Sequence, residues 1–163
     1  MLDNFSTRAT QLVFAARLKA GERGAAVVDT DDLLVGLALE DQGLLLKSLF
    51  PDVEENAFVE KEQPHVPFFS QELAEDLLTK LTKNLPRSQP VPQTTEIPLS
   101  SSLERVFDLA KELPAQFRHS HMEPLHFLAA ILKDDSSEGA KLLRRSGVTL
   151  ENVLSELSRA GED

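Results

Sequence analysis

An internal repeat constrains the fold of this chain more than any other feature of its 163 residues. Adding 94 to a position between Ser6 and Ala38 gives a residue of the same or similar type near the end of the sequence, without a gap. Internal similarity at a fixed spacing indicates two copies of one structural unit that bury their apolar faces against each other. Two unrelated sets of amphipathic helices that coincide by chance are the alternative, because helical periodicity is forgiving. The matching pairs are Ser6 and Ser100, Val13 and Phe107, Ala16 and Ala110, Leu34 and Leu128, Leu37 and Ile131, and Ala38 and Leu132.

Apolar residues recur at helical spacing in both copies, so we expect an all-α fold. The first helix begins at Ser6 or Thr7, which are good N-cap residues, and ends at Gly21. The second begins at the Thr-Asp-Asp run of residues 30–32, whose carboxylates suit the positive end of a helix. Short helices are then predicted over residues 44–49 and 51–58, and the last helix of the chain over residues 150–157.

Residues 63–98 are rich in proline and form the predicted linker. Within them, a single amphipathic segment from Ser70 to Leu85 carries a leucine at every fourth position, which predicts one extra helix between flexible connectors. Phe68 and Phe69 precede this helix and either dock a partner or pack the helix against the bundle. We therefore divide the chain into a first repeat at 1–62, the linker at 63–98 and a second repeat at 99–163, which together form one compact domain.

The charge and composition narrow the classes of function. A formal net charge of −10 repels nucleic-acid phosphates and anionic membranes, so we expect neither partner. The chain has no cysteine, which excludes disulfides and thiolate metal sites and fits a reducing compartment. Because it also lacks the features of a signal peptide and any apolar run of about 18 residues, we expect a cytoplasmic location. No P-loop pattern is present, so ATP hydrolysis is not expected.

One group of residues has the composition of a metal site: His119, His121, Glu123 and His126. Imidazole and carboxylate groups can ligate zinc, and a hydrolase would need three of them around one ion with an open position. The sequence has no H-E-x-x-H pattern, however, and two of the histidines fall in a predicted loop. We expect no catalytic residue and no cofactor, and keep a small metal-dependent hydrolase using His119, His121 and His126 as the alternative.

The two copies also carry a specific order of motifs. The first reads Phe5-Ser6-x-x-Ala9-x-x-Leu12-Val13-x-x-Ala16 and then Val28-x-Thr30-Asp31-Asp32-Leu33-Leu34-x-Gly36-Leu37, and the second reads Leu99-Ser100 through Ala110 and then Met122-Glu123-Pro124-Leu125-His126-Phe127-Leu128-x-Ala130-Ile131-Leu132. In this order and at this spacing, they resemble the N-terminal domains of the Clp ATPase chaperones. The resemblance covers nearly the whole chain apart from the linker.

The resemblance implies two tandem four-helix repeats with pseudo-twofold symmetry, which recruit unfolded or tagged protein substrates or an adaptor protein to a Clp ATPase. In some members of the family, a hydroxyl at the start of a repeat's first helix and an acidic residue at the start of its second helix form a site for phosphorylated arginine. Carried over here, Ser6 with Asp31 keeps both groups, whereas Ser100 faces Leu125, so the second site is expected to be more apolar. The predicted peptide- or adaptor-binding residues are Ser6, Thr7, Asp31, Asp32, Ser100, Leu125 and His126.

Three functions therefore stay open from the sequence. The leading hypothesis is a binding module without an ATPase motor of its own, either as a free-standing protein or as part of a longer chaperone. The metal-dependent hydrolase is the second, and a structural helical module that assembles with itself is the third.

Overall fold

The computed structural model describes residues 4–50, 66–92 and 96–161. All regular secondary structure in these residues is helical, which confirms the predicted all-α fold. The helix predicted over residues 51–58 lies outside the described residues. No helix in the described ranges is both long and apolar enough to cross a membrane. The helices are α1 (Thr7–Glu22), α2 (Thr30–Asp41), α3 (Leu45–Leu49), α4 (Gln71–Asn84), α5 (Ser101–Gln116), α6 (Pro124–Asp134), α7 (Glu138–Arg145) and α8 (Leu150–Gly161).

The internal repeat of the sequence is a repeat of structure. Helices α1 and α5 begin and end 94 positions apart, and so do the starts of α2 and α6. Ser6 and Ser100 are the N-caps of α1 and α5, and each hydroxyl accepts a hydrogen bond from the backbone N–H three residues later. The same local signal therefore starts the same helix in both copies.

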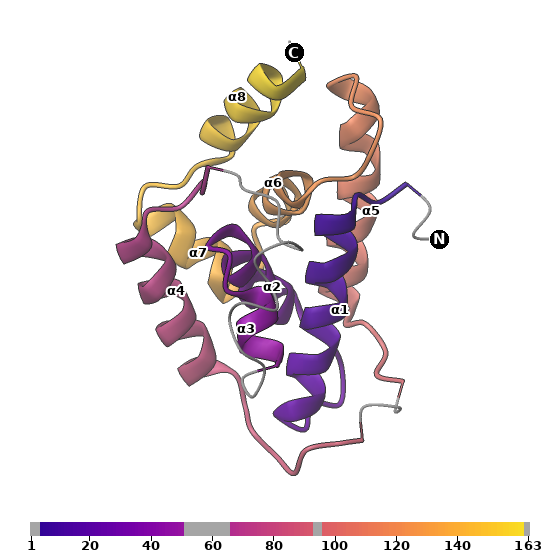
Figure 1. The fold of residues 1–163 in the computed structure, drawn as a ribbon, viewed down its shortest axis with the longest axis vertical. Coiled ribbons are helices and arrows are strands. Elements are labelled where there is room, and N and C mark those ends of the chain that lie inside the picture. Colours follow the sequence, from indigo (N-terminus) through magenta and orange to yellow (C-terminus); the bar gives the residue numbers. More distant parts are fainter. Residues whose placement is uncertain (1–3, 51–65, 93–95, 162–163) are drawn as a thin grey trace.

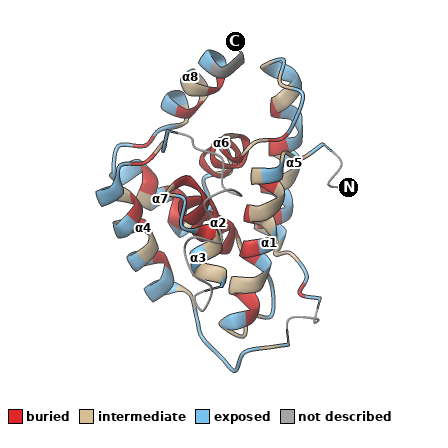
Figure 2. Ribbon diagram, viewed as in Figure 1, coloured by how far each residue is buried: buried red, intermediate tan, exposed pale blue. Residues whose placement is uncertain are grey.

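Helices α2 and α6 form the centre of the bundle, with α1 and α5 on one side and α4, α7 and α8 on the other (Figure 1). Eleven of the twelve residues of α2 are buried, and the buried residues in Figure 2 concentrate in these two helices. A helix that is apolar on all sides requires cover on all sides. Gly36 permits the close packing of α1 on α2, because a Cβ atom there would lie 2.9 Å from the carbonyl oxygen of Leu12.

The helix predicted within the linker is present as α4, with Ser70 as its N-cap. Helix α4 packs against α2 in the first repeat, and α8 packs against α6 in the second. The two helices therefore have equivalent positions in the two repeats. Its buried residues, Ala74, Leu77 and Leu81, form one stripe along the helix. This stripe joins the common core, and it explains the four-residue leucine spacing in the sequence.

Two short backbone pairings link the repeats to each other. Phe5 forms a parallel bridge with Met122, and Val28 forms one with Leu99. The two bridges are related by the 94-residue repeat. Each joins the residue before the N-cap of one repeat's first helix to the loop before the other repeat's second helix. Hydrogen bonds of 2.6–2.9 Å hold both, including those from Ser6 N–H to Met122 and from Ser100 N–H to Val28. The start of each first helix is thus bound to the opposite repeat.

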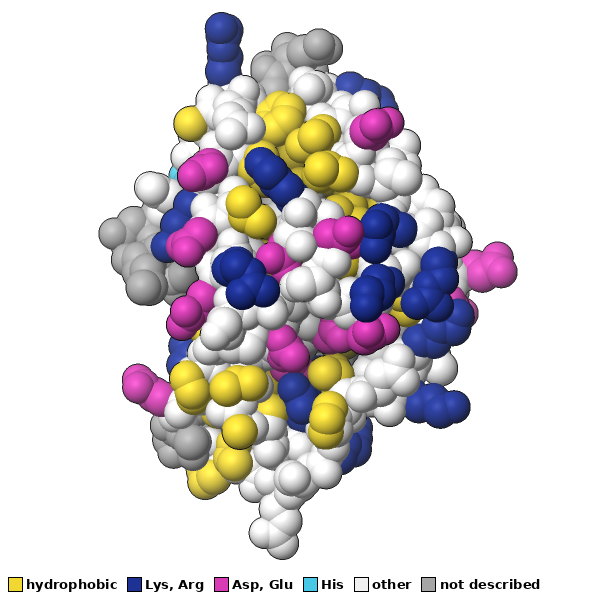
Figure 3. Space-filling view, turned by 180° about the vertical axis from the view of Figure 1, so that it is seen from behind, with side chains coloured by type: hydrophobic (Ala, Val, Ile, Leu, Met, Phe, Trp, Pro, Cys, Tyr) yellow, Lys and Arg dark blue, Asp and Glu magenta, His cyan; other side chains and the backbone are white. Residues whose placement is uncertain are grey.

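The surface on the far side from Figure 1 shows how the exposed side chains divide. Hydrophobic side chains gather in two patches, toward the top and the bottom of this face, and charged side chains of both signs lie between them (Figure 3). The net charge of −10 is therefore not gathered into one acidic surface on this face.

Candidate binding site at the junctions between the repeats

The relative direction of the first and second helix in each repeat determines which of the predicted site residues lie close together. In the first repeat, Arg8 near the start of α1 pairs with Glu40 at the end of α2, at 2.7 Å. Arg23 at the end of α1 pairs with Asp32 at the start of α2, also at 2.7 Å. The two helices are therefore antiparallel, and Ser6 lies a full helix length from Asp31, about 24 Å for sixteen residues.

The predicted pairing of Ser6 with Asp31 is therefore wrong. The second repeat has the same antiparallel arrangement, since Arg105 near the start of α5 pairs with Asp134 at the end of α6, so the predicted pairing of Ser100 with Leu125 is wrong as well. The backbone bridges bring together the opposite sets. The first junction comprises Asp29, Thr30, Asp31 and Ser100, and the second comprises Ser6, Met122, Glu123 and Leu125.

At the first junction, the acidic residues serve the helix ends. Asp29 is the N-cap of α2, one residue before the predicted cap, and its carboxylate accepts a hydrogen bond from the Ser100 hydroxyl at 2.9 Å. Asp32 completes a capping box by accepting the Asp29 N–H, and it is bound by Arg23 through two nitrogens. Asp31 reaches across to α7, where it accepts the Gly139 N–H at 3.0 Å. All three carboxylates thus have partners within the bundle.

Asp31 carries an unusual protonation equilibrium. Burial raises the pKa of its carboxyl to about 6, and the negative charges of Asp29, Asp32 and Glu138 act in the same direction. The hydrogen bond from Gly139 opposes this shift. A carboxylate that is costly to hold ionised in the folded protein is a feature of functional sites as well as of structural ones.

Asp31→Asn is expected to raise the free energy of unfolding at pH 7 by roughly 1–2 kcal/mol. The amide keeps an oxygen for the Gly139 N–H and removes the buried charge. Because the folded-state pKa lies above the ordinary value of 3.8, the native protein holds an extra proton between pH 6 and 3.8, and the carboxylate's cost disappears as pH falls through this window. Urea unfolding at about pH 7.5 and about pH 4 measures both effects. A variant less stable than the parent at neutral pH would mean that the charge is a net stabilising cap for α7.

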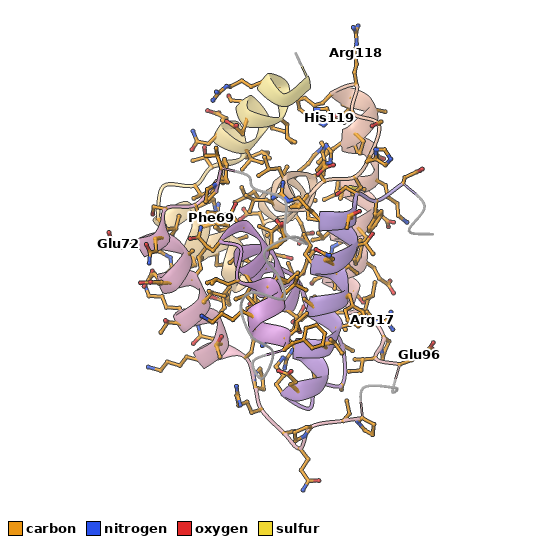
Figure 4. All side chains as sticks on the ribbon, viewed as in Figure 1. Arg17, Phe69, Glu72, Glu96, Arg118 and His119 are labelled. Carbon is orange, nitrogen blue, oxygen red and sulfur yellow. The ribbon has the colours of Figure 1, made fainter. Side chains whose placement is uncertain are left out.

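The second junction opens into a groove of about 490 Å³. Its walls come from α1, α2, α6, α8, the loop between α5 and α6, and the segment before α4. The lining is mixed, with six apolar residues and seven polar or charged ones. The lining residues are Arg8, Leu37, Asp41, Val66, Phe68, Arg118, His119, Ser120, His121, Glu123, Pro124, Leu125 and Leu157. At its rim, Arg118 extends away from the bundle (Figure 4).

A chain of hydrogen bonds, here named the histidine relay, runs beside this groove from Glu123 through His126 and His119 to Leu157. The Glu123 N–H donates to Nδ1 of His126 at 2.7 Å, so in the neutral imidazole Nε2 carries the proton and donates to Nδ1 of His119 at 2.8 Å. Nε2 of His119 then donates to the carbonyl oxygen of Leu157 at 3.1 Å. These bonds assign one tautomer to each of the two rings. The relay connects the start of α6, the α5–α6 loop and α8.

The same geometry bears on the metal-site alternative. Both ring nitrogens of His126 are engaged, one in the capping box of α6 and one with His119. A metal ion would have to displace either the Glu123 N–H from Nδ1 or His119 from Nε2 to use this histidine. His121 lies apart in its bonding, with Nδ1 against the Ser120 hydroxyl. Among the described residues, no three histidine or acidic side chains are placed to hold one ion.

The structure distributes the predicted site residues among different roles. Leu125 is half-buried and lines the groove, and Thr7 is exposed beside Ser6. Asp32 and His126 are fully enclosed and can act only through their neighbours. Sequence reasoning missed Arg8 and His121 as groove residues, since no local pattern shows that the start of α1 faces the α5–α6 loop. The segment before α4 also contributes to the groove, and its Phe68-Phe69 pair was the sequence signal for this contribution.

Comparisons with known proteins agree on the fold. The chain is similar to the N-terminal domain of the chaperone ClpD from Arabidopsis thaliana, with a TM-score of 0.61 at 18% identity, covering 100% of this chain and 97% of that one. The Hsp104 N-terminal domain from Candida albicans gives 0.59 at 18% identity, over 95% and 89%. A structure described as part of preliminary investigations of a malarial protein secretion system gives 0.69 at 17% identity, over 98% and 95%.

Sequence comparison points the same way. The chaperone protein ClpC of the chloroplast from Pisum sativum is 24% identical over 162 residues, which are 98% of this chain. The chain spans 15% of the length of that relative. The Clp repeat (R) N-terminal domain matches residues 69–146 and 109–162, and the two matches together cover more than half of the sequence. With its doubled helical repeat, the chain belongs to the Clp repeat N-terminal domain family.

Proposed function

We propose that this chain is a non-enzymatic binding module that recruits unfolded or tagged protein substrates, or an adaptor protein, for a Clp ATPase. Membership of the Clp repeat family supports a protein-binding role. The single observation that carries the proposal is the groove at the second junction, which is large enough for several side chains and has apolar residues in its lining. A cytoplasmic location stays a prediction from the sequence.

The chemistry of the groove favours a mainly apolar polypeptide. Leu125 and Phe68, which are both half-buried, supply apolar surface to the groove, whereas Leu37 and Leu157 lie beneath it with 2% and 1% of their surface exposed. The charges nearby are largely balanced, since Arg8 is held by two hydrogen bonds to Glu40. Affinity would therefore come from burial of apolar side chains, at about 25 cal/mol per Å² of surface removed from water, rather than from long-range attraction.

The first junction is proposed as a second, smaller surface for a basic group. Asp29 accepts a hydrogen bond from the Ser100 hydroxyl there, and Asp31 is near enough to Asp29 for the two charges to interact, so a guanidinium group would meet two neighbouring carboxylates. Asp31→Asn tests this surface separately, because it removes one charge and keeps the hydrogen-bond geometry. Weaker binding of a basic peptide by this variant, with unchanged binding of an apolar one, is the expected result.

Binding of an unfolded polypeptide tests the main proposal. The probe is a fluorescein-labelled polypeptide kept unfolded by reduction and alkylation of its cysteines, and the signal is its fluorescence anisotropy. Leu125→Gln places a polar amide in the groove and is expected to weaken binding about fivefold or more, since buried apolar contacts dominate such interfaces.

Leu44→Gln is the matched control. Leu44 is 41% exposed and does not line the groove, so its substitution should leave the affinity unchanged. Equal losses for both variants would place the binding surface elsewhere. A Phe68→Ala variant lacks one of the large side chains that line the groove. Absence of binding both to the parent protein and to this variant would overturn the proposed function itself.

A further inference from the structure

A short extended segment of the chain, residues Val66–Phe69, lies along one side of the groove and is here named the strap. Its backbone is held at the end of α2 by side chains rather than by a helix or a sheet. The carboxylate of Asp41 accepts the N–H groups of Phe68 at 2.7 Å and Phe69 at 3.0 Å. The side-chain amide of Gln42 donates to the carbonyl oxygen of Phe69 at 3.0 Å. Donors and acceptors of the main chain are thus bound together, in the manner of a peptide ligand.

Asp41 holds the strap from a position that differs in its partners from the equivalent position of the second repeat. Asp41 is the last residue of α2 and is 6% exposed, and a negative charge at the carboxyl end of a helix is unfavourable. Asp135 is 94 residues later in the repeat, and it pairs with Arg144 at 2.6 Å instead. The first repeat therefore uses this acidic position to hold a main chain where the second uses it for an ion pair.

The two phenylalanines of the strap have different environments. Phe69 is 3% exposed and belongs to the common core, and Figure 4 labels it near the upper end of α4. Phe68 is only half-buried and lines the groove, and its ring meets that of Phe69 edge-on at 5.6 Å. Phe69 anchors the strap and the start of α4, whereas the Phe68 side chain can turn to another rotamer without disturbing either.

We propose that the strap is an internal ligand of the groove, and that an extended polypeptide segment with an aromatic side chain binds there by displacing Phe68. This inference rests on the proposed function and names its ligand class and its regulation. Phe68 of the strap lines the groove together with Leu125, and both side chains are half-buried. A site filled by its own chain binds an outside ligand more weakly, in proportion to the fraction of molecules in which it is open.

Phe68→Ala tests this competition. The substitution leaves the two N–H groups bound to Asp41 and the buried Phe69 in place, so the backbone of the strap stays anchored. We expect the variant to bind the unfolded polypeptide probe roughly 3- to 10-fold more tightly than the parent protein. Phe68→Leu, which fills part of the same space, should give an intermediate affinity. Phe14→Ala is the control, since Phe14 is 54% exposed on α1 and does not line the groove.

A peptide with the sequence of residues 66–71 provides the second measurement. It should bind the Phe68→Ala variant and displace the unfolded probe, whereas the same peptide with alanine in place of its first phenylalanine should not. Unchanged or weaker binding of the probe by Phe68→Ala, beside measurable binding by the parent protein, would overturn the internal-ligand role and leave the proposed function intact. Loss of all binding in both proteins would remove the proposed function and this inference together.

Discussion

Replacing Asp32 with alanine is expected to lower the free energy of unfolding by about 3–5 kcal/mol, the usual cost of removing one partner of a buried ion pair. Asp32 is 1% exposed and accepts hydrogen bonds of 2.7–2.9 Å from two nitrogens of Arg23 and from the Asp29 N–H. The variant would lose the capping box of α2 and leave the largely buried Arg23 guanidinium without its carboxylate. Urea unfolding followed by far-ultraviolet circular dichroism measures the change.

Asp76→Ala is the matched control for this prediction. Asp76 pairs with Lys80 on α4, where both side chains are about half exposed, so its loss should cost less than about 0.5 kcal/mol. A small effect at Asp32, comparable to that at Asp76, would contradict the view that this ion pair closes the α1–α2 hairpin.

The histidine relay is expected to make the protein less stable as pH falls from about 6.5 toward 4. Burial lowers the pKa of His126 to about 4, and the neighbouring His119 acts in the same direction. A proton would have to enter at Nδ1, where the Glu123 N–H already points. The unfolded chain takes up this proton near pH 6.5 and the folded protein does not, so at about pH 5 the relay should cost roughly 2 kcal/mol of stability.

Asp31 acts in the opposite direction and must be separated from this effect. Its folded-state pKa of about 6 means that the native protein gains a proton as pH falls, which offsets part of the loss at His126. The stability of Asp31→Asn should therefore fall more steeply with pH than that of the parent protein. His126→Gln removes the titration but keeps an acceptor at a capping-box position, so its stability should fall less steeply.

Urea midpoints of these proteins at about pH 7.5 and about pH 5 measure the three slopes. Equal slopes for His126→Gln and the parent protein would show that the relay does not control the acid response. A slope for Asp31→Asn shallower than that of the parent would likewise reverse the sign assigned to Asp31.

The sequence by itself determined the secondary structure and the doubling of the fold. The serine N-caps at 6 and 100 and the leucine stripe from 73 to 81 are local signals, because each acts within one or two helical turns, and the 94-residue repeat predicts that the first of them occurs twice. They were sufficient to predict α1 and α4 nearly to the residue.

Only the tertiary structure decided which of these elements meet. Whether Ser100 faces its own repeat or the opposite one depends on the antiparallel packing of each hairpin and on the bridges between repeats, and no sequence spacing encodes either. For the same reason, Asp31 was expected to cap its own helix and to bind ligands. In the structure it accepts the Gly139 N–H at the start of α7, which belongs to the other repeat. The groove depends on five segments distant in the sequence, so its lining, including Phe68, follows from how the helices pack rather than from any local pattern.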